Sequence, residues 1–463
     1  MINSNNNIPQ GWTIAKLGEL VLTEKGKKPK RISKEKTNEC FIPYVNIKAF
    51  EKNIIDEYTD GVGCVLCEDD DFLMVWDGSR SGYVGKAIKG ALGSTLVRIK
   101  LPLINQDLTY YFLKSKFIEI NSRAKGVGIP HVDPNLLWNY DFPLAPLNEQ
   151  ARILAKLEQL LTDLDKGIEY LETTKQQLKV YRQAVLKWAF EGKLTQSGFE
   201  EIELRSDNLG AYIERIEAGK SFKCEERPPS KSEYGVLKVS AVTWGKYDEN
   251  KSKTITDSRF VNENFLVRTG DFIFSRANTL DLIGAVVIAK SVSKNVMLSD
   301  KTLRIIFSKH IVPEYALYYL RSKEGRKQIQ FYSNGNQESM RNIGQTGIKN
   351  ISIPIPKNTD LQTKIVSEIE SRLSVCDKIE ETIESSLQQA EALRLSIIKQ
   401  AFEGKLVPQD PSDEPAEKLL ERIRALRQSS TKLTSRAQGK QGAGKPEKKE
   451  KVKTIKNKVL VNG

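Results

Sequence analysis

Cations and amide side chains gathered between short apolar segments are the residues of this chain that could do chemistry. A stretch bearing glycine and proline carries Lys25, Lys27, Lys28 and Arg31 within seven residues. Lysine and arginine are the side chains that contact the phosphates of a nucleic acid. We expect these four residues to contact phosphate; the alternative is a loop that only water surrounds.

Polar side chains also follow an expected strand in each half of the chain. Arginine pairs with the edge of guanine and asparagine with the edge of adenine, so these positions suit base reading in a duplex. The candidates for DNA contact are Ser79, Arg80 and Tyr83 in the first half, and Lys220, Arg276, Asn278, Asn336, Gln337 and Arg341 in the second.

Each candidate has a structural alternative. Arg80 could form an ion pair within its own turn, with Asp77. Large aromatic side chains are more typical of a core than of a stacking platform for bases. We therefore expect Trp76, Trp244 and Tyr318 to be core residues.

Catalytic patterns are absent from the sequence. Gly219-Lys220-Ser221 has Glu214 where a phosphate-binding loop needs its first glycine, and no glycine-rich turn suits a nucleotide cofactor. Cys64 and Cys67 have the spacing of a zinc knuckle and could be completed by Cys40 and His131, but structural thiols are the favoured interpretation. We predict no catalytic residue, no metal and no cofactor in this chain.

Two related helices must position these groups. Gln150–Leu194 overlies Gln362–Leu406 without a gap, with 18 of 45 positions identical and the same final AFEGKL. Apolar residues recur every seven positions in both, as in a coiled coil. The predicted seam is Leu157, Leu164, Leu171, Leu178 and Val185 in the first copy, and Ile369, Cys376, Ile383, Ala390 and Ile397 in the second.

Charged residues interrupt the other seam position of each helix. Lys175 and Arg182 do so in the first copy, and Glu380 and Arg394 in the second. In an antiparallel pair, Lys175 and Arg182 approach the part of the second copy that holds Glu380 and would set its register. The alternative is that these side chains extend past the seam into solvent.

The segments around the helices form two loosely similar globular units. Asp71-Phe72-Leu73 matches Asp271-Phe272-Ile273, and Gly26-Lys27 matches Gly219-Lys220. A polar, glycine-bearing loop is expected at Asn334–Gly347. The expected organisation is a first domain at 1–146, a helix at 147–194, a second domain at 195–358, a helix at 359–406, a proline-rich segment with a short helix at 407–430, and a basic disordered tail at 431–463.

Composition sets outer bounds on this organisation. A chain of 463 residues is too long for one core. Five cysteines and no apolar run of 18 residues favour a reducing, cytoplasmic location without a membrane span. The net charge of +13 lies mostly in the tail, where ten cations oppose two anions, so charge alone is weak evidence for DNA binding.

The repeated helices carry a family resemblance. Two units, each followed by a heptad helix ending in AFEGKL, together with PLAPLNEQ at Pro143–Gln150 and the later PQDPSDEPAEKLLERI, resemble the specificity subunit of type I restriction-modification systems. The second helix is preceded by PIPKNTDLQ, which is longer between proline and glutamine, so its start is the less certain one.

The resemblance implies an α+β fold with two mixed target recognition domains, two antiparallel coiled-coil helices and a pseudo-twofold internal repeat. It further implies a non-catalytic subunit that recognises a bipartite target in double-stranded DNA. Implied partners are two modification subunits, which use S-adenosylmethionine, and restriction subunits, which use ATP and Mg²⁺.

Two rival functions belong to other classes. A fused methyltransferase or nuclease would need the cofactor and phosphate loops that the sequence lacks. A coiled-coil scaffold would need the heptads but not two divergent globular units. Binding of S-adenosylmethionine by the chain alone would favour the first rival, and equal binding of random and selected duplexes the second.

Overall fold

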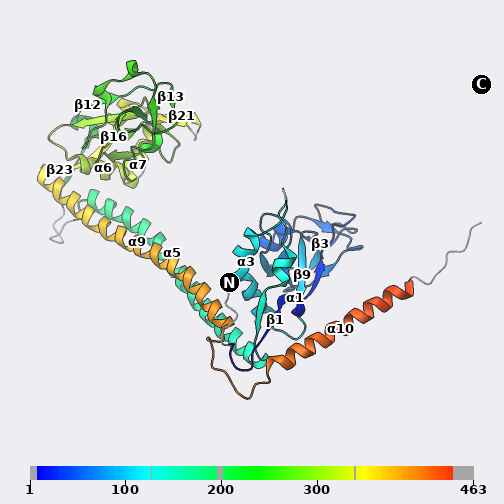
Figure 1. Cartoon of the computed structure of the whole chain (residues 1–463). Coiled ribbons are helices and arrows are strands. Elements are labelled where there is room, and N and C mark those ends of the chain that lie inside the picture. Colours follow the sequence, from blue (N-terminus) through cyan, green and yellow to red (C-terminus); the bar gives the residue numbers. More distant parts are fainter. Residues whose placement is uncertain (1–7, 127, 195–201, 244, 338–339, 442–463) are drawn as a thin grey trace, which may run out of the picture. The chain divides into compact units, whose positions relative to one another are not determined.

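The computed structural model describes residues 8–126, 128–194, 202–243, 245–337 and 340–441, without the side chains of 336–337 and 430–441. The chain divides into two compact units. Unit 1 comprises 1–167 and 389–463, and unit 2 comprises 168–388. Each unit holds one mixed domain and one antiparallel pair of half-helices (Figure 1).

The domain of unit 1 is built on two four-stranded sheets. The first has the order β2-β9-β6-β7 and the second the order β4-β3-β8-β5, in which β3 and β8 are parallel. A separate antiparallel pair, β1 with β10, leads into the long helix. The strands are β1 (Thr13–Lys16), β2 (Leu22–Lys25), β3 (Ile42–Val45), β4 (Tyr58–Thr59), β5 (Leu66–Cys67), β6 (Phe72–Val75), β7 (Val84–Lys86), β8 (Gly90–Leu92), β9 (Leu96–Lys100) and β10 (Asp141–Leu144). The helices are α1 (Leu17–Leu20), α2 (Ile47–Lys52), α3 (Gln106–Ser122) and α4 (Pro134–Trp138).

The domain of unit 2 repeats this plan. Its sheets have the orders β12-β20-β16-β18 and β13-β15-β14-β19, and β11 pairs with β23 as β1 pairs with β10. A three-stranded sheet, β17-β22-β21, is added. The strands are β11 (Leu204–Asn208), β12 (Ile213–Ala218), β13 (Cys224–Glu225), β14 (Tyr234–Leu237), β15 (Ser252–Ile255), β16 (Phe272–Ser275), β17 (Ala277–Asn278), β18 (Val286–Ile288), β19 (Asn295–Met297), β20 (Thr302–Phe307), β21 (Ser333–Gln337), β22 (Met340–Ile343) and β23 (Ser352–Pro356). The helices are η1 (Leu209–Tyr212), η2 (Val239–Ala241), η3 (Ser258–Phe260), η4 (Glu263–Phe265), α6 (Pro313–Arg321), α7 (Lys323–Tyr332) and α8 (Gln345–Lys349).

The polar loop expected at Asn334–Gly347 is not a loop. Its residues form most of the β21–β22 hairpin and the start of α8. The strands are polar because they belong to a small sheet beside the main core, so their pattern lacks the apolar alternation that marks a strand in a sequence.

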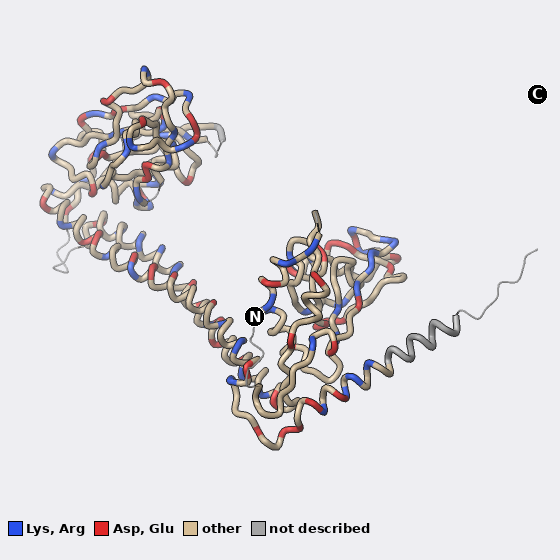
Figure 2. The backbone as a smooth tube through the Cα atoms, in the orientation of Figure 1, with Lys and Arg blue, Asp and Glu red and all other residues tan. Residues whose placement is uncertain are grey.

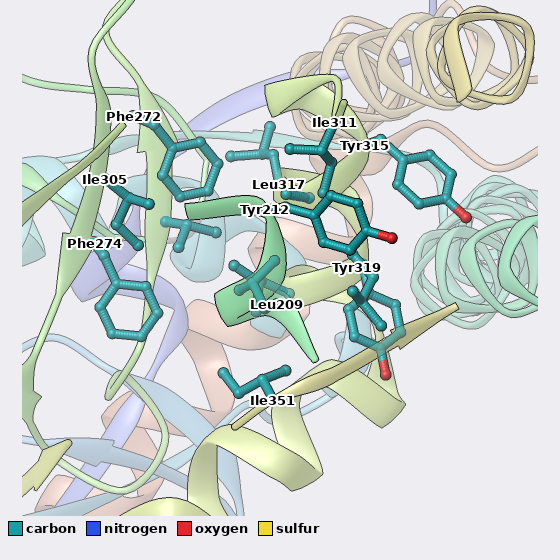
Figure 3. Packing of buried hydrophobic residues seen from close by; sticks show 14 of the residues in the cluster. Leu209, Tyr212, Phe272, Phe274, Ile305, Ile311, Tyr315, Leu317, Tyr319 and Ile351 are labelled. Carbon is teal, nitrogen blue, oxygen red and sulfur yellow. The ribbon is translucent and has the colours of Figure 1, made fainter. Parts of the chain in front are cut away.

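The core of the second domain lies between its main sheet and α6. Phe272, Phe274 and Ile305 extend from β16 and β20 toward Tyr315 and Tyr319 of α6 (Figure 3). Tyr315 is fully buried, and its hydroxyl donates to the carbonyl of Pro354 at 2.7 Å. The polar end of this ring is therefore satisfied, which is the condition for burying a tyrosine at low cost.

The long helices are α5 (Leu147–Phe190) and α9 (Thr359–Phe402), 44 residues each. Each begins three residues before its glutamine, Gln150 or Gln362, so the longer segment before α9 does not alter where that helix starts. Opposite charges are interspersed along both helices (Figure 2).

Most of the predicted seam residues are buried in both units. In unit 1, Leu157 and Leu161 of α5 pack with Ile397 and Ala401 of α9. In unit 2, Leu178 packs with Cys376 and Ile383. Eight of the ten predicted seam residues are buried, and Leu164 and Leu171 are partly buried against the same clusters: the eight are Leu157, Leu178, Val185, Ile369, Cys376, Ile383, Ala390 and Ile397.

The charged seam positions form ion pairs across the antiparallel helices. In unit 2, Lys175 Nζ lies 2.7 Å from Glu384 Oε1, and Arg182 Nη2 lies 3.0 Å from Glu380 Oε2 and 2.7 Å from Asp377 Oδ1. In unit 1, Arg394 pairs with Asp165. These contacts support the register hypothesis over side chains that only extend into solvent.

The segment after α9 returns to the first domain. The short helix expected there is present as α10 (Ala416–Gln441), and its residues Ala416, Leu419, Leu420 and Ile423 join that domain's core. The helix is longer than expected, however, because it continues through Gln441 into the segment predicted to be disordered. Residues 442–463 lie outside the described residues. Among the described helices, none combines the length and the hydropathy needed to cross a bilayer.

Candidate nucleic-acid interface

Residues 76–83, 125–126 and 128–132 form one edge of the first domain, which we call the first reader edge. The buried strand β6 ends at Val75, and the chain then pairs with the segment before α4 through a bridge between Asp77 and His131. The amide of Val132 donates to the carbonyl of Trp76 at 2.9 Å, and that of Gly78 to the carbonyl of Pro130 at 2.8 Å. A rigid strand thus fixes the backbone that carries the predicted reader side chains.

The side chains of the first reader edge are partly committed to one another. Asp77 accepts from Lys25 Nζ at 2.9 Å and lies 3.3 Å from Nδ1 of His131. Arg80 does not pair with Asp77, the alternative considered from the sequence. Its guanidinium instead pairs with Glu51 at 3.0 Å and lies 4.2 Å over the ring of Tyr83. The amide side chain of Asn121, on α3, donates to the backbone carbonyls of Ser79 and Ser81 and so holds the turn against that helix. The side chains of Ser79 and Arg80 are exposed to solvent.

The basic run is held against the sheet by a glycine. A Cβ atom on Gly26 would lie 2.1 Å from the carbonyl oxygen of Gly93, so only glycine allows this approach. Lys27 and Lys28 are exposed, and no ion pair of either is found in the described part of the chain. Arg31 lies 3.5 Å from Glu39 and 3.9 Å from Asp60. Of the four residues predicted to contact phosphate, Lys27 and Lys28 therefore have the fewest carboxylates competing for them.

The second domain repeats this glycine contact. A Cβ atom on Gly219 would lie 1.9 Å from the carbonyl oxygen of Leu298, and Lys220 follows in an exposed position. The match between Gly26-Lys27 and Gly219-Lys220 seen in the sequence thus reflects the same close approach of two backbone segments.

Residues 276–279, together with β21 and β22, form the second reader edge. Ala277 pairs with Asn342 and Asn278 with Arg341, and the amide of Ile343 donates to the carbonyl of Arg276 at 2.9 Å. The Nε of Arg276 donates to Oδ1 of Asn342 at 3.3 Å in an exposed contact. Arg276 and Asn278 therefore stand at the same place in the second domain as Trp76 and Gly78 in the first.

Other predicted reader residues have different surroundings. The guanidinium of Arg341 donates to the carbonyls of Ser333 and Gly335, each at 2.8 Å, which gives it a structural role in the β21–β22 hairpin. The side chains of Asn336 and Gln337 lie outside the described residues.

The aromatic residues expected in the core behave as expected where they are described. Trp76 stacks on Trp138 at 5.9 Å between ring centroids and packs against the core of its domain. The hydroxyl of Tyr318 donates to Glu370 at 3.2 Å, and burial raises the pKa of this phenol. Trp244 lies outside the described residues.

Sequence reasoning missed an ion-pair triad that both domains share. Arg98 of β9 pairs with Glu24 and, at 2.8 Å, with Asp71. Arg304 of β20 pairs in the same way with Glu217 at 2.7 Å and with Asp271 at 2.8 Å. The matching Asp-Phe pairs at the start of β6 and β16 were visible in the sequence, but their arginine partners come from another strand.

The triads lie beside the strands that lead to the reader edges. Only 12% of the Arg98 side chain and 10% of the Arg304 side chain is exposed. The hydrogen bond from Arg98 lowers the pKa of Glu24, although burial opposes this shift. Burial also acts to raise the pKa of Glu217, but hydrogen bonds from Arg304 and Arg215 lower it on balance. In each domain, one arginine with little exposed surface therefore links two carboxylates from different parts of the sheet.

A buried glutamine ties each long helix to its domain. The side chain of Gln150 accepts from the amide of Asn105 at 3.2 Å and donates to the carbonyl of Ala145 at 2.9 Å. That of Gln362 accepts from the amide of Val312 at 2.8 Å and donates to the carbonyl of His310 at 3.1 Å. Asn105 and Val312 are the N-caps of α3 and α6, so both glutamines accept from the N-cap of a domain helix, although they donate to different carbonyls.

The cysteine pair does not resemble a metal centre. The thiol of Cys67 donates to the carbonyls of Ile88 and Gly90 at 3.4 Å each, and burial raises its pKa to about 11. Within the described residues, no group of three or more histidine, cysteine or acidic residues could hold a metal ion.

Comparisons with known proteins agree with two repeated domains. A family model described as "Type I restriction modification DNA specificity domain" matches residues 9–179 and 216–389. The chain is 27% identical over 423 residues to the type I restriction enzyme MjaVIII specificity subunit of Methanocaldococcus jannaschii, covering 86% of this chain and 94% of that protein. It is 26% identical over 470 residues to the EcoKI specificity subunit of Escherichia coli, covering 92% and 98%.

Two solved structures share the fold. One, described as the structural basis of complex assembly and conformational transition of the type I R-M system, matches with a TM-score of 0.64 at 17% identity, over 86% of this chain and 99% of that chain. The HsdS subunit from Thermoanaerobacter tengcongensis matches with a TM-score of 0.54 at 17% identity, over 88% and 100%. With the family model matching more than half of its residues, the chain belongs to the type I restriction-modification specificity subunits, the non-catalytic subunits that recognise DNA sequence.

Proposed function

We propose that each domain reads one half of a bipartite target in double-stranded DNA through its own reader edge. Lys27, Lys28 and Lys220 neutralise phosphates, because they are exposed cations fixed to the sheet by an adjacent glycine. Arg80 with Ser79 and Tyr83 in the first domain, and Arg276 with Asn278 in the second, contact base edges.

The observation that supports this proposal is the contrast between scaffold and edge. The two domains have the same strand order in the main sheet, the same triad and a buried glutamine at the start of each long helix, yet their edges carry different side chains. Trp76 and Asp77 occupy the positions of Arg276 and Ala277. Differences confined to an edge suit two domains that read different base sequences.

The partners follow from the same proposal. Two modification subunits, carrying S-adenosylmethionine, dock on the long helices and methylate adenine, and restriction subunits, carrying ATP and Mg²⁺, cleave the DNA. In unit 2 an apolar groove formed by Leu178, Tyr181, Arg372, Val375 and Ile379 offers a docking surface, since Val375 and Ile379 are exposed although their side chains are apolar. Such work on cellular and incoming DNA takes place in the cytoplasm.

Competition binding tests the proposal. The chain, assembled with its modification subunit, is expected to prefer a selected duplex over a random one. Arg276→Ala or Asn278→Ala should relax the second half-site by about 1–3 kcal/mol for each lost base contact and leave the first half-site unchanged. Arg259→Ala is the matched control, because Arg259 is an exposed arginine of the same domain that pairs with nearby Asp257.

Two results would contradict the proposal. Equal binding of selected and random duplexes would favour a scaffold. An equal loss at both half-sites in the Arg276→Ala protein would mean that the domains do not read independently.

A further inference from the structure

Two large apolar side chains are exposed beside the reader edges. Ile129 is 62% exposed in the first domain and Met340 is 69% exposed in the second. A single exposed apolar residue is common on any protein and has no meaning by itself. These two are unusual because they occupy the same structural position in two domains whose edges otherwise differ.

Strand pairing establishes that the positions are equivalent. The bridge between Asp77 and His131 in the first domain corresponds to the pair of Ala277 and Asn342 in the second. Ile129 and Met340 each lie two residues before the second member of that pair. If the pairing is continued in the same register, both residues fall opposite the polar segment that follows the reader positions.

The neighbours of the two side chains are reader candidates. The carbonyl of Pro130, next to Ile129, accepts from the amide of Gly78, one residue before Ser79. Arg341, next to Met340, pairs with Asn278. A duplex that contacts Ser79 or Asn278 through its base edges is therefore within reach of these apolar side chains.

The base edges of a major groove offer one apolar group, the C5-methyl of thymine. Contact between an exposed isoleucine or methionine and that methyl group makes the free energy of binding more favourable, because both apolar surfaces leave water. Cytosine and uracil lack the group, so the contact distinguishes thymine from both.

We infer that Ile129 and Met340 are specificity-determining residues, and that each covers the methyl group of one thymine in the half-site read by its domain. The inference rests on the proposed function, since it assumes that the reader edges face base pairs. It adds a hydrophobic contact to the hydrogen bonds of the reader side chains.

Uracil substitution tests the inference without altering any hydrogen bond of the DNA. The assembled complex is titrated with its mapped target duplex and with duplexes in which one thymine at a time is replaced by uracil. For one thymine in each half-site, loss of the methyl group should weaken binding about fourfold, the effect of one buried methylene-sized group.

Protein variants then assign each methyl group to a residue. Met340→Ala should abolish the uracil effect in the second half-site and keep it in the first, and Ile129→Ala should do the reverse. Ile118→Ala is the control, because Ile118 is 77% exposed but lies on α3 outside the reader edge, and both uracil effects should persist in it.

The outcomes separate this inference from the proposed function. Selective binding that no uracil substitution weakens would overturn the inference and leave the proposed function intact. Uracil effects that persist in both variants, or variants that instead weaken assembly with the modification subunit, would also overturn it. Loss of all selectivity in the wild-type complex would count against the proposed function itself.

Discussion

The two domains are alike where they face their own cores and different where they face outward. Arg98 and Arg304 join the same three strands, and Gln150 and Gln362 make the same joint with a long helix. At the reader edges, in contrast, a short bridge in the first domain is replaced in the second by the sheet of β17, β22 and β21.

This difference shows how one scaffold can hold two readers. The shared residues are buried and have satisfied hydrogen bonds, so replacing them leaves a charge or a polar group unpaired. The exposed residues at the edges, such as Ser79 and Arg80, lie outside the core, so they can change without disturbing it. Substitutions of the shared residues test this division between scaffold and edge. The arginines of the two triads should show the largest loss of stability.

Removing either triad arginine should destabilise its own domain most. Arg304→Met leaves Asp271 and Glu217 without their shared cation, at a cost of about 3 kcal/mol in the free energy of unfolding, and Arg98→Met should behave in the same way. Urea denaturation measures the effect. Arg215→Met is the control, because Arg215 also pairs with Glu217 but is 67% exposed, so less than about 1 kcal/mol is expected.

The triad also predicts a pH dependence. Because the hydrogen bond from Arg98 holds the pKa of Glu24 below its ordinary value of 4.5, this carboxylate stabilises the folded state above that pH. The stabilisation is lost as pH falls through the lowered folded-state pKa. Arg98→Met should therefore lose less stability than the wild type on acidification below pH 4.5, and identical pH profiles would contradict the account.

The glutamine joints should matter equally in the two domains. Gln362→Met keeps the volume of the side chain but leaves the amide of Val312 and the carbonyl of His310 unpartnered, at a cost of about 2 kcal/mol in stability. Gln150→Met should cost a similar amount. Thermal denaturation of both variants measures these losses, with the exposed Gln400→Met as the control. A clear difference between the losses caused by Gln150→Met and Gln362→Met would contradict the account.

The ion pairs of the helix seam should contribute least. Arg182→Glu faces Glu380 and Asp377 with a like charge and should lower stability by about 1 kcal/mol, because these side chains are partly exposed. Adding Glu380→Arg should restore much of that loss. A double variant that is no more stable than Arg182→Glu alone would show that these charges do not set the register.

The helices were predictable from the sequence because their heptads are local. Leu157 and Ile397 lie on a seven-residue repeat, and with the antiparallel direction that the family resemblance implies, that repeat brings Arg182 near Glu380. The end of α10 was misplaced because its last residues, up to Gln441, form a helix without an apolar face.

The reader edges were harder to predict because their contacts join residues that are distant in the sequence. The ion-pair partner of Arg80 is Glu51 of α2 rather than the nearby Asp77. Arg341 donates to the backbone of the β21–β22 hairpin, and the sequence of that hairpin lacks the apolar alternation that predicts a strand. The sequence indicated which side chains could read bases, but only the fold distinguishes Arg276, whose contact with Asn342 is exposed, from Arg341, which supports a hairpin.

The central claim is that two independent readers are separated by a helical spacer, and mapping methylated adenines for a lengthened spacer tests it most directly. Seven residues would be inserted between Thr173 and Thr174 of α5 and between Ser385 and Ser386 of α9, which the pairing of Lys175 with Glu384 places opposite each other. Two added turns keep the seam in phase and lengthen the helices by about 10 Å.

In cells that supply the modification subunit, the account predicts that both half-site sequences stay the same. The gap between them should widen by up to about three base pairs, since one base pair spans about 3.4 Å. An active variant that methylates the original sites at the original spacing would contradict it.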